Sequence, residues 1–227
     1  MNNKKVTVIM SVFNNESTLE NSIKSILKQS YENLEFLITD DYSADKSLNI
    51  LYKYKDEDSR VKIISNKENI GLTKSLNNMI KIADGDYIAR QDADDISLSH
   101  RLETQVKTLN FSNAKICTSR ALKMDTKTKI PGFSFYIPYK YSIFFKNPFI
   151  HGTLLIDSLL MKNYLYDESY YFAQDYELFS RIIKNNENII NINEALYILN
   201  TKNNISKNFK DEQKSYANIV KNNLRKF

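Results

Sequence analysis

Strand-like and helix-like runs alternate through the first half of this sequence, and no other feature constrains the fold as strongly. Apolar runs rich in β-branched residues fill positions 5–12, 34–39, 61–65 and 87–89. Between them, apolar residues recur every three or four positions, which is the spacing of an amphipathic helix. Repeated strand–helix–strand units predict an α/β domain around a mostly parallel sheet. Ligands of such sheets bind beyond the carboxyl ends of the strands.

The second half of the sequence is less regular. It predicts strands over 115–120, 149–157 and 196–199, and helices over 98–109 and from Asp175 onward. Residues 133–149 also hold eight aromatic side chains. We expect most of these rings in the core, with one or two free to stack on a sugar.

Composition is that of a globular protein. Of 227 residues, 42% are hydrophobic and 26% are charged, and no apolar run reaches the roughly 18 residues that span a bilayer. The only cysteine, Cys117, excludes an intrachain disulfide and a cysteine-based zinc site. We therefore expect a reducing, cytoplasmic setting.

Positive charge is concentrated at the C-terminal end. The formal net charge is +5, and residues 202–227 hold seven basic against two acidic residues, so the rest of the chain is neutral. A neutral body argues against a nucleic-acid partner. Five apolar residues of the tail approximate a helical stripe: Phe209, Tyr216, Ile219, Val220 and Leu224. Such a basic amphipathic helix either lies on an anionic membrane or docks on the domain, and both interpretations stay open.

The stretch YIARQDADDI places three aspartates at the end of the fourth predicted strand. In extended backbone, Asp92 and Asp94 project to the same side. Two such carboxylates share a proton, bind a hard divalent cation such as Mg²⁺ or Mn²⁺, or begin a helix. We expect a cation to offset their repulsion. Asp95 would then cap or start the next helix, and Arg101 would pair with an acid of the cluster.

Two more signals follow predicted strands. Phe13 comes after the first strand and Asp41 after the second, so three strand ends should meet at one edge of the sheet. A ring that stacks on a nucleobase and a carboxylate that accepts its N–H would recognise a nucleotide. Phe13 is equally consistent with the core, and Asp41 with a helix-capping loop.

The three aspartates have other possible interpretations. A solvated turn before a capped helix needs no ligand and stays open. The phosphatase motif DxDxT is excluded by Ile96, and a calcium loop lacks its central glycine and late glutamate. A nucleotidyltransferase would need a glycine- and arginine-rich phosphate loop after the first strand, which the sequence lacks.

Together and in this order, these signals resemble a family 2 glycosyltransferase of the GT-A fold. The matching text is VTVIMSVFNNESTLENSIKSILKQSYENLEFLITDDYSADKS, SRVKIISNKENIGLTKSLNNMIKIADGDYIARQDADDISLSHRLETQ and FAQDYELFSRI. The resemblance covers residues 5–110 strongly and 149–184 more weakly. It implies a three-layer α/β/α sandwich in one domain, 1–201. Residues 1–110 would bind the nucleotide sugar and 111–201 the acceptor, followed by the tail 202–227.

The resemblance also implies roles for the acids and their neighbours. Phe13 would flank the base, Asp41 would accept from it, and Ser11 would make a weaker nucleotide contact. Asp92 would face the ribose or the metal. Asp94 would bind the Mn²⁺ or Mg²⁺ that bridges the two phosphates.

Asp175 matches the family's catalytic base, which deprotonates an acceptor hydroxyl in an inverting displacement. Gln174 departs from the family, in which an acid commonly precedes the base. Tyr42 and Ser43 likewise replace a usual Gly-Ser pair. His151 lies in a segment that the family often uses near the acceptor or the phosphates, and a structural role is nearly as consistent.

The implied function is transfer of a hexose from a nucleotide sugar, a UDP-sugar in the first place, to a saccharide or lipid-linked glycan. The product would enter cell-envelope polysaccharide or lipooligosaccharide. The enzyme would be cytoplasmic, with the tail 202–227 as a contact to the inner face of the membrane. The alternative is a catalytically weak nucleotide-sugar or glycan-binding module of the same fold.

Overall fold

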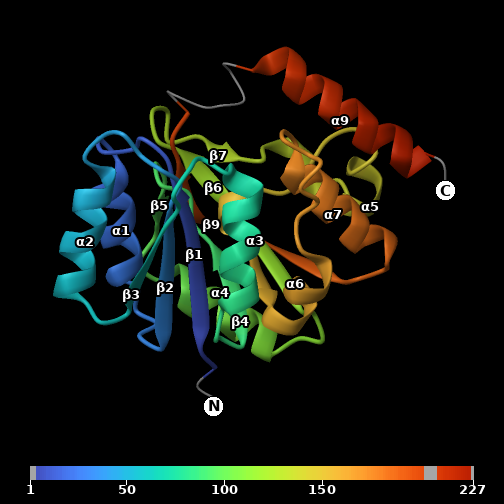
Figure 1. The fold of residues 1–227 in the computed structure, drawn as a ribbon. Coiled ribbons are helices and arrows are strands. Elements are labelled where there is room, and N and C mark those ends of the chain that lie inside the picture. Colours follow the sequence, from blue (N-terminus) through green and yellow to red (C-terminus); the bar gives the residue numbers. More distant parts are fainter. Residues whose placement is uncertain (1–3, 202–208, 226–227) are drawn as a thin grey trace.

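The strands of the first half form a parallel sheet, as the alternating pattern predicts. The computed structural model describes residues 4–201 and 209–225. The sheet begins in the order β3-β2-β1-β4. These strands are β1 (Val6–Val12), β2 (Leu34–Asp40), β3 (Val61–Ser65) and β4 (Tyr87–Arg90). All four are parallel, so their carboxyl ends lie along the upper edge of the sheet in Figure 1.

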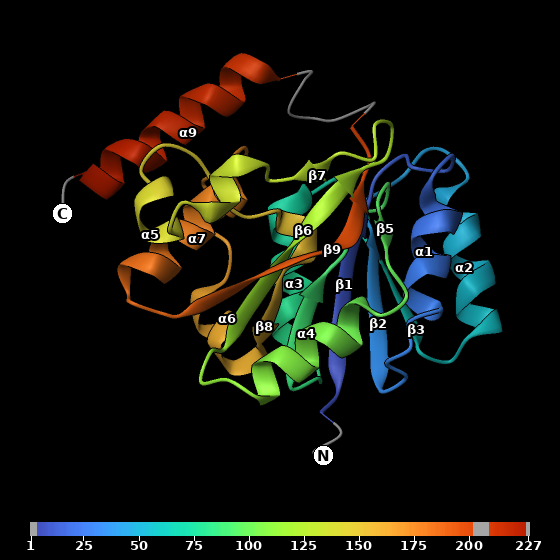
Figure 2. The same cartoon turned by 180° about the vertical axis from the view of Figure 1, so that it is seen from behind.

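The rest of the sheet is mixed. β8 (Leu155–Asp157) is antiparallel both to β4 and to β6 (Ile116–Lys123). β6 pairs in parallel with β9 (Ile189–Leu199), and the short strand β7 (Lys129–Ile130) pairs with β6. The two-residue strand β5 (Ile96–Ser97) pairs with the end of β9. β9 therefore crosses the back of the molecule and ends beside the residues that follow β4 (Figure 2).

Helices cover both faces of the sheet, which confirms the predicted three-layer fold. Side chains of a strand alternate between its faces, so Val8 and Met10 of β1 point to one layer and Ile9 to the other. The first layer consists of α1 (Leu19–Leu27), α2 (Ser47–Glu57) and α4 (Arg101–Asn110). The second consists of α3 (Leu72–Ile82), α6 (Ser158–Tyr164) and α7 (Gln174–Lys184).

The C-terminal helix α9 (Lys210–Arg225) packs on α7 (Figure 1). Val220 and Leu224 are buried in the same core as α7, and Tyr216 packs against that core. Phe209 and Ile219 remain about half exposed. Across residues 4–201 and 209–225, no helix is long and apolar enough to cross a membrane. The parts of the predicted tail at 202–208 and 226–227 lie outside the described residues.

The aromatic segment differs most from expectation. Residues 133–149 form η1 (Phe133–Tyr136), α5 (Tyr139–Ser142) and connecting loops, and only Phe149 of the eight aromatic residues is buried. The expectation of a mostly buried segment is wrong, because single-turn helices cannot hide side chains that point away from the sheet. Phe149 packs on Phe179 with ring centroids 4.7 Å apart.

Two element boundaries also differ. The predicted strand 149–157 divides into the short helix η2 (His151–Thr153) and β8, and α4 begins at Arg101 rather than at residue 98. The last predicted strand, 196–199, is the end of the much longer β9. These shifts matter because η2 and β9 both supply side chains to the site.

Candidate active site

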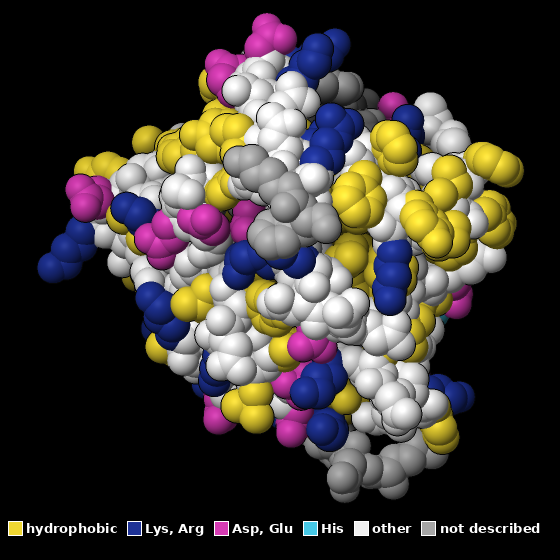
Figure 3. Space-filling view, turned by 90° about the vertical axis from the view of Figure 1, so that its right-hand side faces the viewer, with side chains coloured by type: hydrophobic (Ala, Val, Ile, Leu, Met, Phe, Trp, Pro, Cys, Tyr) yellow, Lys and Arg dark blue, Asp and Glu magenta, His cyan; other side chains and the backbone are white. Residues whose placement is uncertain are grey.

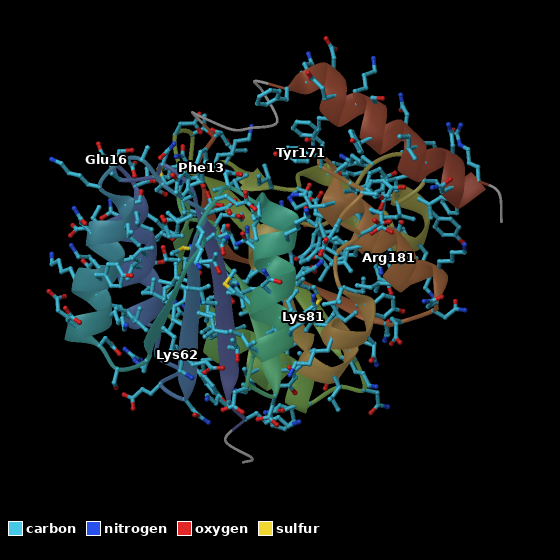
Figure 4. The ribbon with its side chains drawn as sticks, in the orientation of Figure 1. Phe13, Glu16, Lys62, Lys81, Tyr171 and Arg181 are labelled. Carbon is cyan, nitrogen blue, oxygen red and sulfur yellow. The ribbon has the colours of Figure 1, made fainter. Side chains whose placement is uncertain are left out.

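The segments that carry the predicted acids are joined at the carboxyl edge of the sheet. The backbone N–H of Asp41 donates to the Val12 carbonyl at 2.8 Å, which ties the end of β2 to β1. The Ser22 hydroxyl of α1 donates to the Asp92 carbonyl at 2.7 Å, which ties the acid cluster to the helix that follows Phe13. In Figure 4, Phe13 and Tyr171 lie at this edge, whereas Lys62 lies at the opposite one.

The loop after β1 is bonded to the loop after β2. The Asn14 N–H donates to the Ser43 hydroxyl at 3.0 Å, and the Ala44 N–H donates back to Asn14 Oδ1 at 2.8 Å. Asn14 and Tyr42 adopt left-handed backbone with φ of 52° and 67°. Phe13, at the tip, leaves 48% of its surface exposed, so its ring is available for stacking and is not a core residue. Ser11 is half-buried in β1.

Asp41 is buried, and its carboxylate already binds the chain. Its Oδ1 accepts hydrogen bonds from the Asn66 amide (2.8 Å) and the Ile70 N–H (2.9 Å). Its Oδ2 accepts one from the Gly71 N–H at 2.8 Å. Each carboxylate oxygen has two acceptor sites, so Oδ2 retains one for a ligand. The role of Asp41 toward a nucleobase stays a prediction.

Arg90 lies against the aspartate cluster, and the sequence interpretation missed it. Its side chain is 2% exposed, and its Nη2 forms an ion pair with Asp92 Oδ1 at 2.5 Å. The Arg90 Nε has no hydrogen-bond partner among the described residues. Arg90 therefore neutralises one of the two carboxylates that we expected a cation alone to balance. The sequence does contain a signal for this ion pair, namely an arginine inside a predicted buried strand, two residues before an acid.

Asp94 differs from Asp92 in having no such partner. Burial and the neighbouring Asp92 charge raise the Asp94 pKa to about 6. No side chain among the described residues hydrogen-bonds its carboxylate, and hard oxygen donors of this kind suit Mg²⁺ or Mn²⁺. The residues present thus fit a divalent cation. No described group of three or more His, Cys, Asp or Glu could hold one, so further ligands would have to come from substrate phosphates or water.

Asp95 plays a structural part that the sequence did not predict. Its Oδ1 accepts a 2.6 Å hydrogen bond from the Asn200 N–H, and burial, followed by the charge of Asp92, raises its pKa. The expectation that it caps the next helix is wrong, because the N-cap of α4 is His100. Asp95 instead joins the cluster to the end of β9.

Arg101 does not pair with the cluster either. It is fully buried, and its guanidinium donates to uncharged oxygens of Gln91, Ser97, Gln105 and two backbone carbonyls. Its charge also lies over the ring of Tyr197, 5.2 Å from the centroid. The predicted ion pair is therefore wrong. Arg101 instead holds together the buried residues next to the aspartate cluster.

Tyr197 forms a hydrogen bond with the backbone of the aspartate cluster. Its hydroxyl accepts a hydrogen bond from the Asp92 N–H at 3.1 Å. Gly152 of η2 lies against this ring, and a Cβ there would come within 2.5 Å of the hydroxyl. Nothing in the local sequence signals this contact, because Tyr197 and Asp92 lie far apart in the chain.

Asp175 is the second residue of α7. Its Oδ2 accepts a hydrogen bond from the Asn147 amide at 2.8 Å, and its Oδ1 accepts one from the Tyr176 N–H at 2.8 Å. Ala173, just before the helix, is left-handed with φ 55°. These contacts hold the carboxylate at the helix N-terminus, where a negative charge is favoured.

His151 and Tyr166 form a hydrogen-bonded pair. His151 Nε2 lies 2.6 Å from the Tyr166 hydroxyl. Burial lowers the His151 pKa, the positive charge of Arg90 lowers it further, and the negative charges of Asp175 and Asp92 oppose both effects. Residues 147–152 connect the two acids, because Asn147 donates to the Asp175 carboxylate and Gly152 lies against Tyr197, whose hydroxyl accepts from the Asp92 N–H. One acid follows β4 and the other begins α7.

A mostly parallel sheet with helices on both faces and acidic side chains at its carboxyl edge is the arrangement expected for a glycosyltransferase of the GT-A fold. The chain belongs to family 2 of these enzymes, because the model described as "Glycosyl transferase family 2" matches residues 7–165. This match confirms the predicted family.

Two relatives are named as glycosyltransferases. EpsE of Bacillus subtilis is 36% identical over 199 residues, which cover 85% of this chain and 72% of EpsE. WfgD of Escherichia coli is 32% identical over 196 residues, which cover 85% of this chain and 75% of WfgD. Its name is UDP-Glc:alpha-D-GlcNAc-diphosphoundecaprenol beta-1,3-glucosyltransferase.

Solved structures confirm the fold. TarS residues 1–349 of S. aureus, in complex with UDP-GlcNAc, superposes with a TM-score of 0.79 at 19% identity over 95% of this chain. The mannosyltransferase PcManGT of Pyrobaculum calidifontis, in complex with GDP-Man and Mn²⁺, gives 0.75 at 17% identity over 94% of this chain. This chain spans only 65% and 61% of those two chains.

Proposed function

We propose that this protein is an inverting, metal-dependent glycosyltransferase that moves a hexose from a UDP-sugar to a saccharide. One observation carries the proposal: residues 147–152 connect the two acids, because Asn147 donates to the Asp175 carboxylate and Gly152 lies against Tyr197, whose hydroxyl accepts from the Asp92 N–H. A donor diphosphate and an acceptor hydroxyl could therefore meet between them. The name of WfgD and the UDP-GlcNAc complex of TarS support a UDP-sugar donor, and the name of WfgD supports a lipid-linked acceptor. Transfer to such an acceptor would suit cell-envelope polysaccharide or lipooligosaccharide synthesis.

The nucleotide would lie over the carboxyl ends of β1, β2 and β4. The exposed ring of Phe13 would stack on the base, and the free acceptor site of Asp41 Oδ2 would take a base N–H. Ser11 would contribute a weaker contact. Asp94, with Asp92 beside it, would hold a Mn²⁺ or Mg²⁺ that, when bound, offsets the negative charge of the departing diphosphate.

The chemical step needs one proton acceptor. The Asp175 carboxylate would take the proton of the acceptor hydroxyl while the hydroxyl oxygen bonds to the anomeric carbon. The bond from that carbon to the diphosphate oxygen breaks, and UDP leaves with the electron pair. A single displacement inverts the anomeric configuration. Asn147 and the Tyr176 N–H keep the carboxylate aimed throughout.

Calorimetry with UDP, with and without Mn²⁺, followed by a donor-hydrolysis assay over a panel of nucleotide sugars, tests the proposal. We expect Mn²⁺ to strengthen UDP binding and at least one sugar nucleotide to turn over. Metal-dependent binding without turnover of any donor would favour the binding module of the same fold. Absence of UDP binding in both conditions would contradict a UDP-dependent site.

Membrane contact through the tail is the least supported part of the sequence-based prediction. Val220 and Leu224, two of the five apolar tail residues, are buried against the domain and cannot enter a bilayer without α9 undocking. With α9 docked, membrane contact through the tail would be limited to its exposed side chains, which include Phe209 and Ile219.

A further inference from the structure

Exposed apolar side chains gather within residues 111–201, the predicted acceptor half. We call this surface the aromatic face, and it consists of Phe133, Tyr136, Ile137, Tyr141, Phe144 and Phe145. Their exposed fractions run from 38% to 83%, and they are six of the fifteen large hydrophobic side chains exposed among the described residues. Figure 3 shows hydrophobic side chains gathered at the upper right, with Lys or Arg among them. Apolar surface this concentrated usually marks an interaction site.

The stretch of sequence that carries the aromatic face has charges of a single sign. Residues 126–156 contain no aspartate or glutamate, although the whole chain has 27 in 227 residues. The same stretch has four lysines, and all are exposed: Lys127, Lys129, Lys140 and Lys146. An apolar surface whose own segment carries only positive charge is complementary to a surface that is apolar within and anionic outside.

Internal contacts hold this surface in shape. Lys146 Nζ donates to the Ser134 hydroxyl at 3.0 Å, which ties the residues after α5 to η1. The Arg120 guanidinium lies over the Phe135 ring, 5.0 Å from its centroid. Ile143 and Phe149 are buried and anchor the segment to the core. These contacts fix the position of the segment that carries the exposed rings.

We propose that the aromatic face seats this protein on an anionic lipid bilayer. Tyr and Phe rings would enter the headgroup region, and the lysines would meet lipid phosphates. A second copy of the chain fits less well, because lysine is depleted from protein interfaces and the four lysines would face their own copies. On α9, Val220 and Leu224 are buried, and of the apolar stripe Phe209 and Ile219 remain about half exposed, so the aromatic face offers more exposed apolar side chains for peripheral attachment.

The aromatic face continues directly into the candidate active site. Asn147 follows Lys146 and donates to the Asp175 carboxylate at 2.8 Å. A lipid-linked acceptor held at the bilayer surface would therefore arrive on the side of the proposed base. This last step rests on the proposed function, whereas lipid binding itself does not.

Sedimentation of the full chain with vesicles tests the inference. One set contains phosphatidylcholine alone and the other phosphatidylcholine and phosphatidylglycerol in equal parts. We expect clear binding to the anionic set only. The triple variant Phe133→Ser, Tyr141→Ser, Phe145→Ser should bind about tenfold more weakly or worse, and the pair Lys129→Glu, Lys140→Glu should also lose binding.

Matched controls distinguish binding through the aromatic face from nonspecific hydrophobic binding. Phe111 and Leu159 are each 75% exposed and lie outside the aromatic face, so Phe111→Ser and Leu159→Ser should bind vesicles like the wild type. Circular dichroism would verify folding of every variant. Wild-type failure to bind anionic vesicles, equal loss in the controls, or a dimer in sedimentation velocity that the triple variant dissociates would each overturn the proposal. The assay contains no donor or metal, so failure of the transferase proposal would leave its result unchanged.

Discussion

Arg90 gives the two aspartates of the DxD motif different electrostatic surroundings. Asp92 is paired with a buried guanidinium, whereas Asp94 has burial and a like charge beside it. An unbalanced carboxylate costs stability in the metal-free protein and at the same time favours a cation. Function and stability are therefore opposed at Asp94.

Asp94→Asn should separate these two effects. We expect loss of Mn²⁺-dependent UDP binding, together with a gain in the free energy of unfolding of about 1–2 kcal/mol at pH 7.5, because the raised pKa marks a disfavoured charge. Urea unfolding without metal and calorimetry with metal measure the two effects. At pH 5 the stability gain should shrink, since the wild-type carboxyl is then largely protonated. A variant that binds UDP and Mn²⁺ normally would refute the role of Asp94.

Asp175→Asn tests the proposed base. The amide cannot accept the hydroxyl proton, so turnover should fall by about 10²–10⁴-fold while UDP affinity stays within twofold. One local hydrogen bond is lost, because Asn147 donates to an oxygen that the variant can replace with an NH₂ group. Asp211→Asn, another acid in the first turn of a helix, is the matched control and should change neither quantity. Near-normal turnover in Asp175→Asn would exclude the base role.

At the scale of elements, η2 and β9 meet in one close contact beside the aspartates. Gly152→Ala would press a methyl group against the hydroxyl and ring of Tyr197, both within 2.8 Å. Tyr197 is fully buried and cannot move aside, so we expect a loss of about 2–3 kcal/mol in the free energy of unfolding and weaker UDP binding. Gly132→Ala, where nothing lies within 4 Å of the added carbon, should be neutral in the same urea titration. Equal behaviour of the two variants would contradict this account.

Docking of α9 can be measured in the same way. Leu224 is 9% exposed and Ile219 is 45% exposed on the same helix. Leu224→Ala should cost about 2 kcal/mol or more of unfolding free energy, and Ile219→Ala should cost much less, because only the first leaves a cavity. A helix held mainly by lipid would show similar small losses for both variants in the absence of vesicles.

At the scale of the whole molecule, the two edges of the sheet respond oppositely to acid. At the edge opposite the site, burial raises the Glu35 pKa, but hydrogen bonds from Lys62, Thr7 and the Asp84 N–H outweigh burial and lower it to about 2. At the binding edge, the Asp94 pKa is raised to about 6.

The signs of these shifts predict the pH profile of the metal-free protein. A carboxyl with a raised pKa takes up its proton more readily when folded, so stability should rise as pH falls from about 7 to about 4.5. Glu35 acts the other way, and its contribution should be lost between about pH 4.5 and pH 2. The raised pKa of buried Asp95 adds to this rise, and the lowered pKa of His151 opposes it below about pH 6.5. In thermal melts, Asp94→Asn should therefore weaken the rise between about pH 7 and pH 4.5 relative to the wild type, and Glu35→Gln should weaken the fall below about pH 4.5. Unchanged pH profiles in both variants would contradict the assignment.

How far the sequence predicts this molecule depends on the range of the interactions involved. The strands β1 to β4 and the helices between them follow from local periodicity, and β3 matches residues 61–65 without error. The short strand β5 was not predicted. The exposure of Phe133 or Tyr141 could not be predicted, because it depends on whether another element covers the ring. The role of Arg90 could have been predicted, because its charge lies beside the acids in the sequence. That of Tyr197 could not, since its contact with Asp92 depends on the path of β9.

The bonded loops after β1 and β2 have a thermodynamic consequence for the donor. Asn14, Ser43 and Ala44 hold each other before any ligand arrives, and the Glu16 carboxylate accepts from the Lys46 N–H at 2.9 Å. The loops that we propose to recognise the base are thus preorganised, so little conformational entropy would be lost there on binding. Discrimination between nucleobases would then reside in a rigid template, leaving adaptation to the sugar and acceptor side.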